Sequence, residues 1–93
     1  MSLAGSWRKI PSDPCDRLYP DEIEFKEATY LGKKGPEQGF IVWDAGIYEI
    51  VGPDEVKISI ATDELVLYRF SISGDILTVT DREGCEFRYR RAG

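Results

Sequence analysis

The chain has 93 residues, of which 42% are hydrophobic, 12% aromatic and 31% charged, and its formal net charge is −5. This size and composition are those of one ordinary globular domain spanning residues 1–93, with too many aromatic residues for a disordered chain. The negative charge argues against a nucleic-acid partner, because that affinity comes largely from cationic side chains that neutralise phosphates.

Several kinds of chemistry are disfavoured by what the sequence lacks. The chain has no histidine, which removes the usual general base, the Ser-His and Cys-His nucleophile pairs and most zinc sites. Its two cysteines cannot hold a structural zinc ion on their own. We therefore expect a protein that is not an enzyme and that uses no metal or cofactor.

Membrane and targeting signals are also missing from the sequence. No apolar run approaches the roughly 20 residues that a membrane-spanning helix needs. Residues 1–5 (MSLAG) lack the basic and apolar regions of a secretory signal peptide. We therefore expect a cytoplasmic protein that does not span a membrane, unless a leader has already been removed.

The first half of the chain alternates short extended segments with loops. Apolar and polar residues alternate as in half-buried strands at residues 3–10, 22–26, 28–32 and 46–51. Residues 11–20 hold three prolines and two aspartates, so we expect a long ordered loop there, without a regular element. Residues 33–39 form a second loop. The apolar residues 40–43 are either a short separate strand or the lead-in to the next one.

The second half of the chain is more regular. Strand patterns occupy residues 55–61, 64–73, 76–81 and 85–91. Gly74-Asp75 is a two-residue hairpin signal, and residues 82–84 form a three-residue loop that ends in Gly84.

These last two turns allow a test of register, because turn length fixes which residues face each other. The expected pairs are Ser73–Ile76, Ile72–Leu77, Phe70–Val79, Asp81–Cys85, Val79–Phe87 and Leu77–Tyr89. With these pairs, the apolar residues of all the strands involved stay on one face. Turn chemistry and periodicity therefore agree independently.

About eight strands joined mostly by tight turns predict an all-β, antiparallel up-and-down meander. Such a meander avoids exposed edges most simply by closing into a small barrel. The last strand then pairs with the first, which brings Arg91 to Trp7 on the inner face and leaves Arg88 and Arg90 outside. A guanidinium over an indole contributes ~0.5–2 kcal/mol.

Several short motifs resemble a known family. Gly5-Ser6-Trp7 on the first strand, with an arginine at the end of the last, is similar to the calycin pattern of lipocalins and fatty-acid-binding proteins. Other matching motifs are Phe25 with Tyr30, Trp43 with Gly46-Ile47-Tyr48, Gly74-Asp75-Ile76-Leu77, and Phe87 with Arg90 and Arg91. Together they resemble small bacterial lipocalin-like domains of unknown function over the whole chain. The resemblance implies a lipocalin-like β-barrel.

Large side chains are expected to line or fill this barrel. One interpretation is a cavity for a small apolar ligand, oriented by the hydroxyls of Tyr30, Tyr48 and Tyr68. The alternative is a core filled by the aromatic side chains themselves. Trp43, beside a predicted turn, either lines the barrel mouth or caps the core.

The two cysteines are expected at the same end of the barrel, because Cys15 follows the first strand and Cys85 begins the last. A disulfide between them is geometrically possible, and closing a loop of about 70 residues contributes ~4 kcal/mol in the chain-entropy model. Two free thiols are the alternative.

Leu65, Leu67 and Ile76 face outward in the predicted register. They form either a surface for a partner or a homodimer, or scattered apolar residues that need no explanation. Two functional hypotheses remain. The first is a non-enzymatic lipocalin-like domain that binds a small apolar ligand in the barrel. The second is a protein-interaction module with a filled barrel, which uses its outer face or the 11–20 loop.

Overall fold

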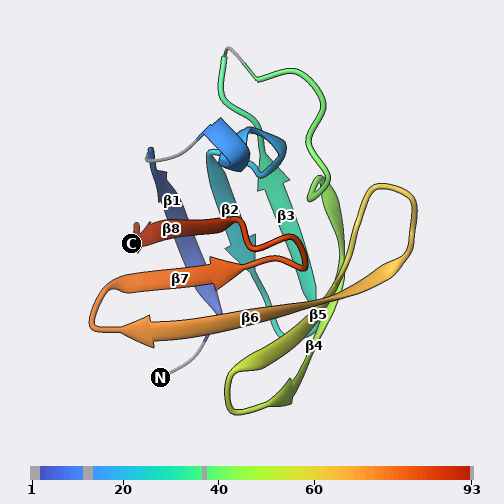
Figure 1. Cartoon of the computed structure of the whole chain (residues 1–93), viewed down its shortest axis with the longest axis vertical. Helices are drawn as coiled ribbons and strands as arrows, with labels where there is room; N and C mark the ends of the chain where they lie inside the picture. The colour runs from blue at the N-terminus through green and yellow to red at the C-terminus, as the bar shows by residue number, and fades with distance from the viewer. Residues whose placement is uncertain (1–2, 12–13, 37, 93) are drawn as a thin grey trace.

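The protein folds as one closed β-barrel in a computed structural model that describes residues 3–11, 14–36 and 38–92 (Figure 1). The strands are β1 (Gly5–Ile10), β2 (Glu22–Phe25), β3 (Thr29–Lys33), β4 (Ala45–Gly52), β5 (Glu55–Ser59), β6 (Leu65–Ser73), β7 (Ile76–Thr80) and β8 (Glu86–Arg91). Each strand pairs antiparallel with the next, and β8 returns to pair with β1. The predicted all-β, up-and-down meander that closes into a barrel is confirmed.

The register of the last strands follows from their turns. Gly74 (φ 60°) and Gly84 (φ 88°) take left-handed backbone conformations, which glycine adopts without steric cost. The pairs Ser73–Ile76, Ile72–Leu77, Phe70–Val79, Val79–Phe87 and Leu77–Tyr89 all occur as predicted. The Asp81 N–H also donates to the Cys85 carbonyl at 3.0 Å. The turns and the apolar alternation therefore select the same inner face.

The 11–20 segment departs from the prediction. It was expected to hold no regular element, but residues Pro14–Leu18 form a short 3₁₀ helix, η1. Proline is tolerated at the first position of a helical turn, because the backbone N–H that it lacks would have no partner within the helix there. The turn closes with a hydrogen bond from the Tyr19 N–H to the Asp16 carbonyl at 3.1 Å. The proline content of residues 11–20 indicated a loop, and the prediction therefore missed this short helix.

The segment 40–43 is not a strand. It belongs to the connection between β3 and β4, which lies with η1 at the top of Figure 1. Its Val42 N–H donates to the Leu18 carbonyl, and its Val42 carbonyl accepts from the Ala61 N–H, both at 2.8 Å. The chain passes so close to β3 that a Cβ on Gly32 would lie 1.9 Å from the Trp43 carbonyl oxygen. These contacts direct the Trp43 side chain into the barrel.

Large apolar side chains pack together inside the barrel. The large apolar residues that are buried are Leu3, Trp7, Tyr19, Ile23, Phe25, Tyr30, Ile41, Trp43, Val56, Ile58, Val66, Tyr68, Leu77, Val79, Phe87 and Tyr89. The ring centroid of Trp43 lies 4.8 Å from that of Tyr19, 5.0 Å from Tyr68 and 5.5 Å from Phe87. Such contacts between aromatic rings add to the stabilisation from burial alone.

The barrel closes where β8 meets β1. Trp7 pairs with Arg91, and the Arg91 guanidinium carbon lies 4.2 Å from the centroid of the Trp7 ring. Arg91 also donates to the Ala4 carbonyl at 3.0 Å, and the Trp7 indole N–H donates to the Leu3 carbonyl at 2.9 Å. These contacts join both ends of the chain at the seam between the first and last strands.

Candidate functional site

The three tyrosines predicted to orient a ligand, and Trp43, which was predicted to line the barrel mouth or cap the core, use their polar atoms within the protein. The Tyr30 hydroxyl donates to the Ser59 carbonyl at 2.5 Å, and the Tyr48 hydroxyl donates to the Lys26 carbonyl. The Trp43 indole N–H donates to the Tyr68 hydroxyl at 3.2 Å. The structure brings Trp43 and Tyr68 together in the aromatic core, whereas Tyr48 lies nearer the opposite rim and contacts Phe25.

Burial determines the ionisation state of these tyrosines. Desolvation raises the pKa of Tyr30, and the nearby Asp44 carboxylate raises it further. Desolvation also raises the pKa of Tyr68, against smaller opposing effects of hydrogen bonds with Trp43 and Tyr19. Both hydroxyls therefore stay neutral at physiological pH, and neither has the lowered pKa of an activated nucleophile.

Tyr19 is a central residue of the barrel end that η1 covers, and the sequence patterns did not identify it. Its ring stacks on Phe87 with centroids 4.0 Å apart and an interplanar angle of 16°. Its hydroxyl donates to Asp81 Oδ2 at 2.8 Å. The available signal was the Leu18-Tyr19 pair, two large apolar residues inside an otherwise polar, proline-rich segment.

Asp81 fixes the turn between β7 and β8. Its Oδ1 accepts hydrogen bonds from the backbone N–H groups of Glu83 and Cys85, each at 2.9 Å. Its Oδ2 accepts from Tyr19, so one carboxylate holds both its own turn and the segment that follows η1. Burial first, and then neighbouring Tyr68 and Asp81, raise the pKa of Tyr19, which keeps its hydroxyl a neutral donor.

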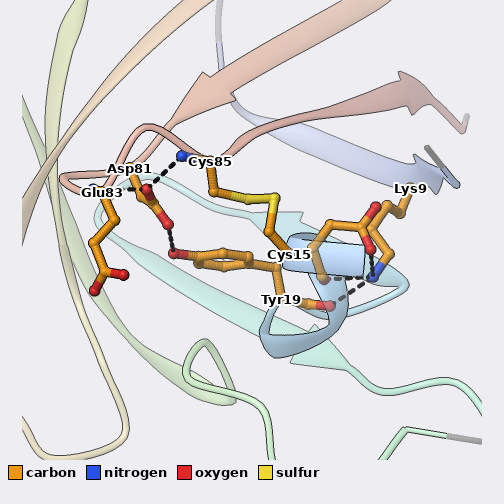
Figure 2. The surroundings of a disulfide bond; sticks show 7 residues. Lys9, Cys15, Tyr19, Asp81, Glu83 and Cys85 are labelled. Atoms are coloured by element: carbon orange, nitrogen blue, oxygen red, sulfur yellow. Dashed lines mark hydrogen bonds and ion pairs between the residues drawn. A yellow bond between two sulfur atoms is a disulfide. The ribbon is translucent and has the colours of Figure 1, made fainter. Parts of the chain in front are cut away.

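A disulfide joins Cys15 of η1 to Cys85 beside β8, across a sequence separation of 70 residues. Figure 2 shows it beside the Tyr19–Asp81 hydrogen bond, so a covalent link and a polar contact hold the same segment. Cys15 is exposed and Cys85 is half-buried. The structure thus pairs the two cysteines that the sequence placed at one end of the barrel.

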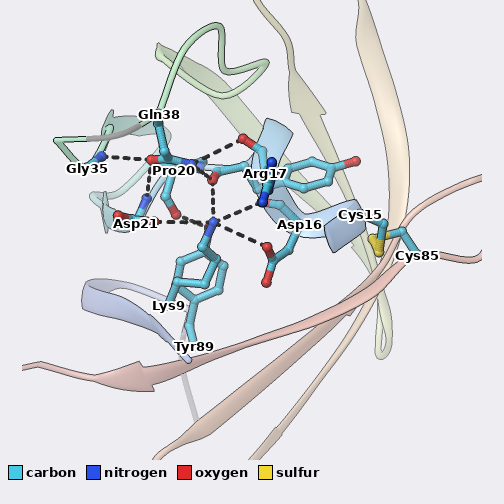
Figure 3. A network of polar contacts seen from close by, with 11 residues as sticks. Lys9, Cys15, Asp16, Arg17, Pro20, Asp21, Gly35, Gln38, Cys85 and Tyr89 are labelled. Atoms are coloured by element: carbon cyan, nitrogen blue, oxygen red, sulfur yellow. Dashed lines mark hydrogen bonds and ion pairs between the residues drawn. A yellow bond between two sulfur atoms is a disulfide. The ribbon is translucent and has the colours of Figure 1, made fainter. Parts of the chain in front are cut away.

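A second set of contacts holds η1 from its other side (Figure 3). The Lys9 ammonium donates to the carbonyls of Asp16 and Tyr19, both at 2.9 Å, and lies 3.3 Å from Asp21 Oδ1. The Lys9 side chain is only 6% exposed. Gln38 donates to the Tyr19 carbonyl at 2.7 Å. The network positions η1 over the barrel end.

Lys9 is a residue that sequence analysis could have placed. It lies two positions after Trp7 on β1, and alternation therefore puts both side chains on the inner face. An inward lysine requires oxygen acceptors, and the aspartates of the following loop are the nearest in sequence.

An open cleft of ≈310 Å³ lies between η1, the 81–85 turn and the beginning of the β5–β6 connection. Its lining residues are Cys15, Leu18, Tyr19, Val42, Ile60, Val66, Tyr68, Asp81, Arg82, Glu83 and Cys85. The lining of the cleft therefore combines aliphatic side chains, two tyrosines and charged groups with the disulfide. Arg82 at its edge lies 4.0 Å from Glu64, in an exposed ion pair.

The three outward apolar residues do not form one cluster. Leu65 and Leu67 are half-exposed near the start of β6, whereas Ile76 pairs with Ser73 beside the β6–β7 turn. Ser73 lies six positions after Leu67 on β6, which is about 20 Å along a strand. Ile47 of β4 instead lies in the same row as Leu65, and Ser59 of β5 stands between the two residues.

The described residues hold no group of three or more His, Cys, Asp or Glu side chains that could bind a metal ion. Within the same residues, no helix is long and apolar enough to cross a membrane. Comparisons with protein-family models, curated proteins and solved structures found no match to this chain. Functional inference therefore depends on the geometry of the site.

Proposed function

We propose that this domain is a non-enzymatic protein-interaction module, which receives an apolar side chain of a partner protein in the cleft between η1 and the 81–85 turn. In this proposal the barrel is lipocalin-like in architecture, but its interior serves as its own core. Within the 11–20 segment, of which residues 12 and 13 lie outside the described part of the chain, Cys15, Leu18 and Tyr19 line the cleft and form the recognition element.

The observation that carries the proposal is the packing of the interior. Trp43 and Phe87 at its centre have 0% exposure, and Tyr30 and Tyr68 have 3%. A ligand inside the barrel would have to displace these rings, and overpacking a dense core is destabilising. A surface cleft needs no such displacement.

The size of the cleft favours a side chain of a larger partner over a free small molecule. Its volume of ≈310 Å³ is at the lower end of the range for ligand pockets, roughly 300–1,000 Å³. Ligand pockets usually bury 70–90% of a drug-sized molecule, and an open cleft cannot do so alone. A folded partner would supply the missing cover.

Charge at the cleft favours a partner with basic residues beside its apolar one. The charged side chains that line the cleft are two carboxylates, Asp81 and Glu83, and one cation, Arg82, so the lining carries a net negative charge. The whole chain also carries a net charge of −5. Charge complementarity of this kind adds specificity and association rate more than affinity.

The test is a binding titration with the peptide acetyl-Arg-Phe-Arg-amide, followed by NMR. Leu18→Lys should abolish binding, because it removes an apolar wall of the cleft and places a cation beside the arginines of the peptide. Leu65→Lys is the matched control, because Leu18 and Leu65 are 49% and 48% exposed. Equal binding by both variants would contradict the proposal, as would equal affinity for acetyl-Glu-Phe-Glu-amide.

A second candidate is a homodimer through the outer face of β4–β6. Ile47, Leu65 and Leu67 are 52%, 48% and 40% exposed; Leu65 and Leu67 lie two positions apart on β6, and Ser59 of β5 separates Leu65 from Ile47. Ile76 is too far along the sheet to belong to this surface. Sedimentation at increasing protein concentration tests it: a dimer abolished by Leu67→Lys supports this candidate, and a monomer throughout excludes it.

A further inference from the structure

The outer face of the barrel places opposite charges across from each other. The opposite-charge pairs in register are Arg8–Glu22, Glu22–Lys33, Glu49–Lys57 and Glu55–Arg69. Opposite charges directly across a strand pair stabilise a sheet, whereas like charges there destabilise it. The arrangement is therefore what folding stability alone would favour.

One pair breaks this pattern. Arg8 of β1 lies directly across from Arg90 of β8, and it is the only like-charge pair among the strand registers of the described residues. Within that part of the chain, Arg90 forms no ion pair. Arg8 lies 3.7 Å from Glu22, with the two side chains 70% and 50% exposed, so this contact neutralises it weakly.

A shallow hollow of ≈340 Å³ lies at this pair. Its lining residues are Arg8, Lys9, Ile10, Pro11, Arg90, Arg91 and Ala92. The charged ends of Lys9 and Arg91 turn elsewhere, toward the Asp21 carboxylate and the Trp7 ring. Arg8 and Arg90 are thus the cations available to a group bound in this hollow.

We propose that Arg8 and Arg90 form a binding site for an oxyanion, a phosphate or a carboxylate group. Guanidinium groups present paired N–H donors that match the oxygen spacing of both groups. A bound anion would offset the repulsion between the two arginines, so a pair that costs stability in the free protein would contribute to anion binding. The site shares no lining residue with the cleft beside η1, so it does not depend on the function proposed there.

The experiment compares melting temperatures in inorganic phosphate and in sodium chloride at equal, low ionic strength. Phosphate should raise the melting temperature of the wild type more than chloride does, because a ligand that binds the native state stabilises it. Arg90→Gln should remove this difference and weaken phosphate binding about tenfold, as expected for loss of one charge-assisted partner. Arg88→Gln is the control and should retain the difference, because Arg88 is already paired with Glu86 at 2.7 Å.

Succinate in place of phosphate distinguishes the two sources of the oxyanion. A larger shift with phosphate assigns a phosphate ligand, and a larger shift with succinate assigns a carboxylate ligand. Equal shifts in phosphate, succinate and chloride would mean simple screening of charge and would overturn the proposal.

Arg90→Glu provides an independent test, because it converts the like-charge pair to an opposite-charge pair. It should raise the melting temperature in low salt and abolish the phosphate effect. A lowered melting temperature, or a retained phosphate effect, would overturn the proposal.

Discussion

Tyr19 donates a hydrogen bond to Asp81 across 62 residues of sequence, at 2.8 Å. The bond joins the segment after η1 to the turn between β7 and β8, on one side of the candidate cleft. It lies beside the Cys15–Cys85 disulfide, so the two links connect the same parts of the chain. The shape of the cleft therefore depends on contacts between segments that are distant in sequence.

Tyr19→Phe should destabilise the protein by about 1.5–3 kcal/mol, because it removes a hydrogen bond to a charged group. The Asp81 carboxylate keeps its bonds from the N–H groups of Glu83 and Cys85, so the turn itself should persist. Urea unfolding measures the change. An unfolding free energy equal to that of the wild type would show that the Tyr19–Asp81 bond contributes nothing.

Arg91→Ala should destabilise the barrel by about 1–2 kcal/mol, because Arg91 covers the Trp7 ring at the closing seam. Arg88→Ala should change stability by less than about 0.5 kcal/mol, since its partner Glu86 is also at the surface. Thermal unfolding of both variants checks the difference. Equal melting shifts would contradict the role given to Arg91 in closure.

Replacing Cys15 and Cys85 together by alanine should lower the unfolding free energy by about 4 kcal/mol in the chain-entropy model. This is a large fraction of the stability of a domain of 93 residues, which is typically about 5–14 kcal/mol. Guanidinium unfolding of the oxidised wild type and the double variant gives the comparison. A difference below about 1 kcal/mol would mean that the Lys9 network and the Tyr19–Asp81 bond hold η1 without the disulfide.

Alkaline pH should unfold the protein through its buried tyrosines. Burial raises the pKa of Tyr89 well above its usual value, and Asp16 and Asp21 raise it further. The unfolded state therefore loses the Tyr89 proton first, at a pH of about 10, so stability is intact below that pH and falls above it. Tyrosinate absorbance and circular dichroism should change together. Ionisation of all tyrosines before any loss of structure would contradict this.

The regular part of the fold could be predicted because its signals are local. Turn length at Gly74-Asp75 and Gly84 fixed the pairing of the last strands, and alternation then assigned each side chain to a face. The closing contact of Arg91 with Trp7 follows from the same parity. A meander pairs neighbours in sequence, so local information specifies most of its geometry.

The irregular part of the fold could not be predicted in this way. Nothing periodic marks Tyr19 or Trp43, whose rings enter the core from connections that lie over the barrel end. Their positions depend on contacts between segments that are distant in sequence, such as the stacking of Tyr19 on Phe87. The cleft is built from these segments, and the sequence therefore indicated the barrel more completely than the candidate site.

The most direct test of the account is a methyl NMR titration with toluene, a neutral apolar probe small enough to enter a barrel. If the interior is filled, toluene should not shift the methyl signals of Ile23 and Leu77, which are buried inside the barrel, whereas acetyl-Arg-Phe-Arg-amide should shift those of Leu18 and Ile60 in the cleft. Shifts at Ile23 and Leu77 with toluene, and none at Leu18 and Ile60 with the peptide, would show a ligand cavity in the barrel and contradict the proposed surface function.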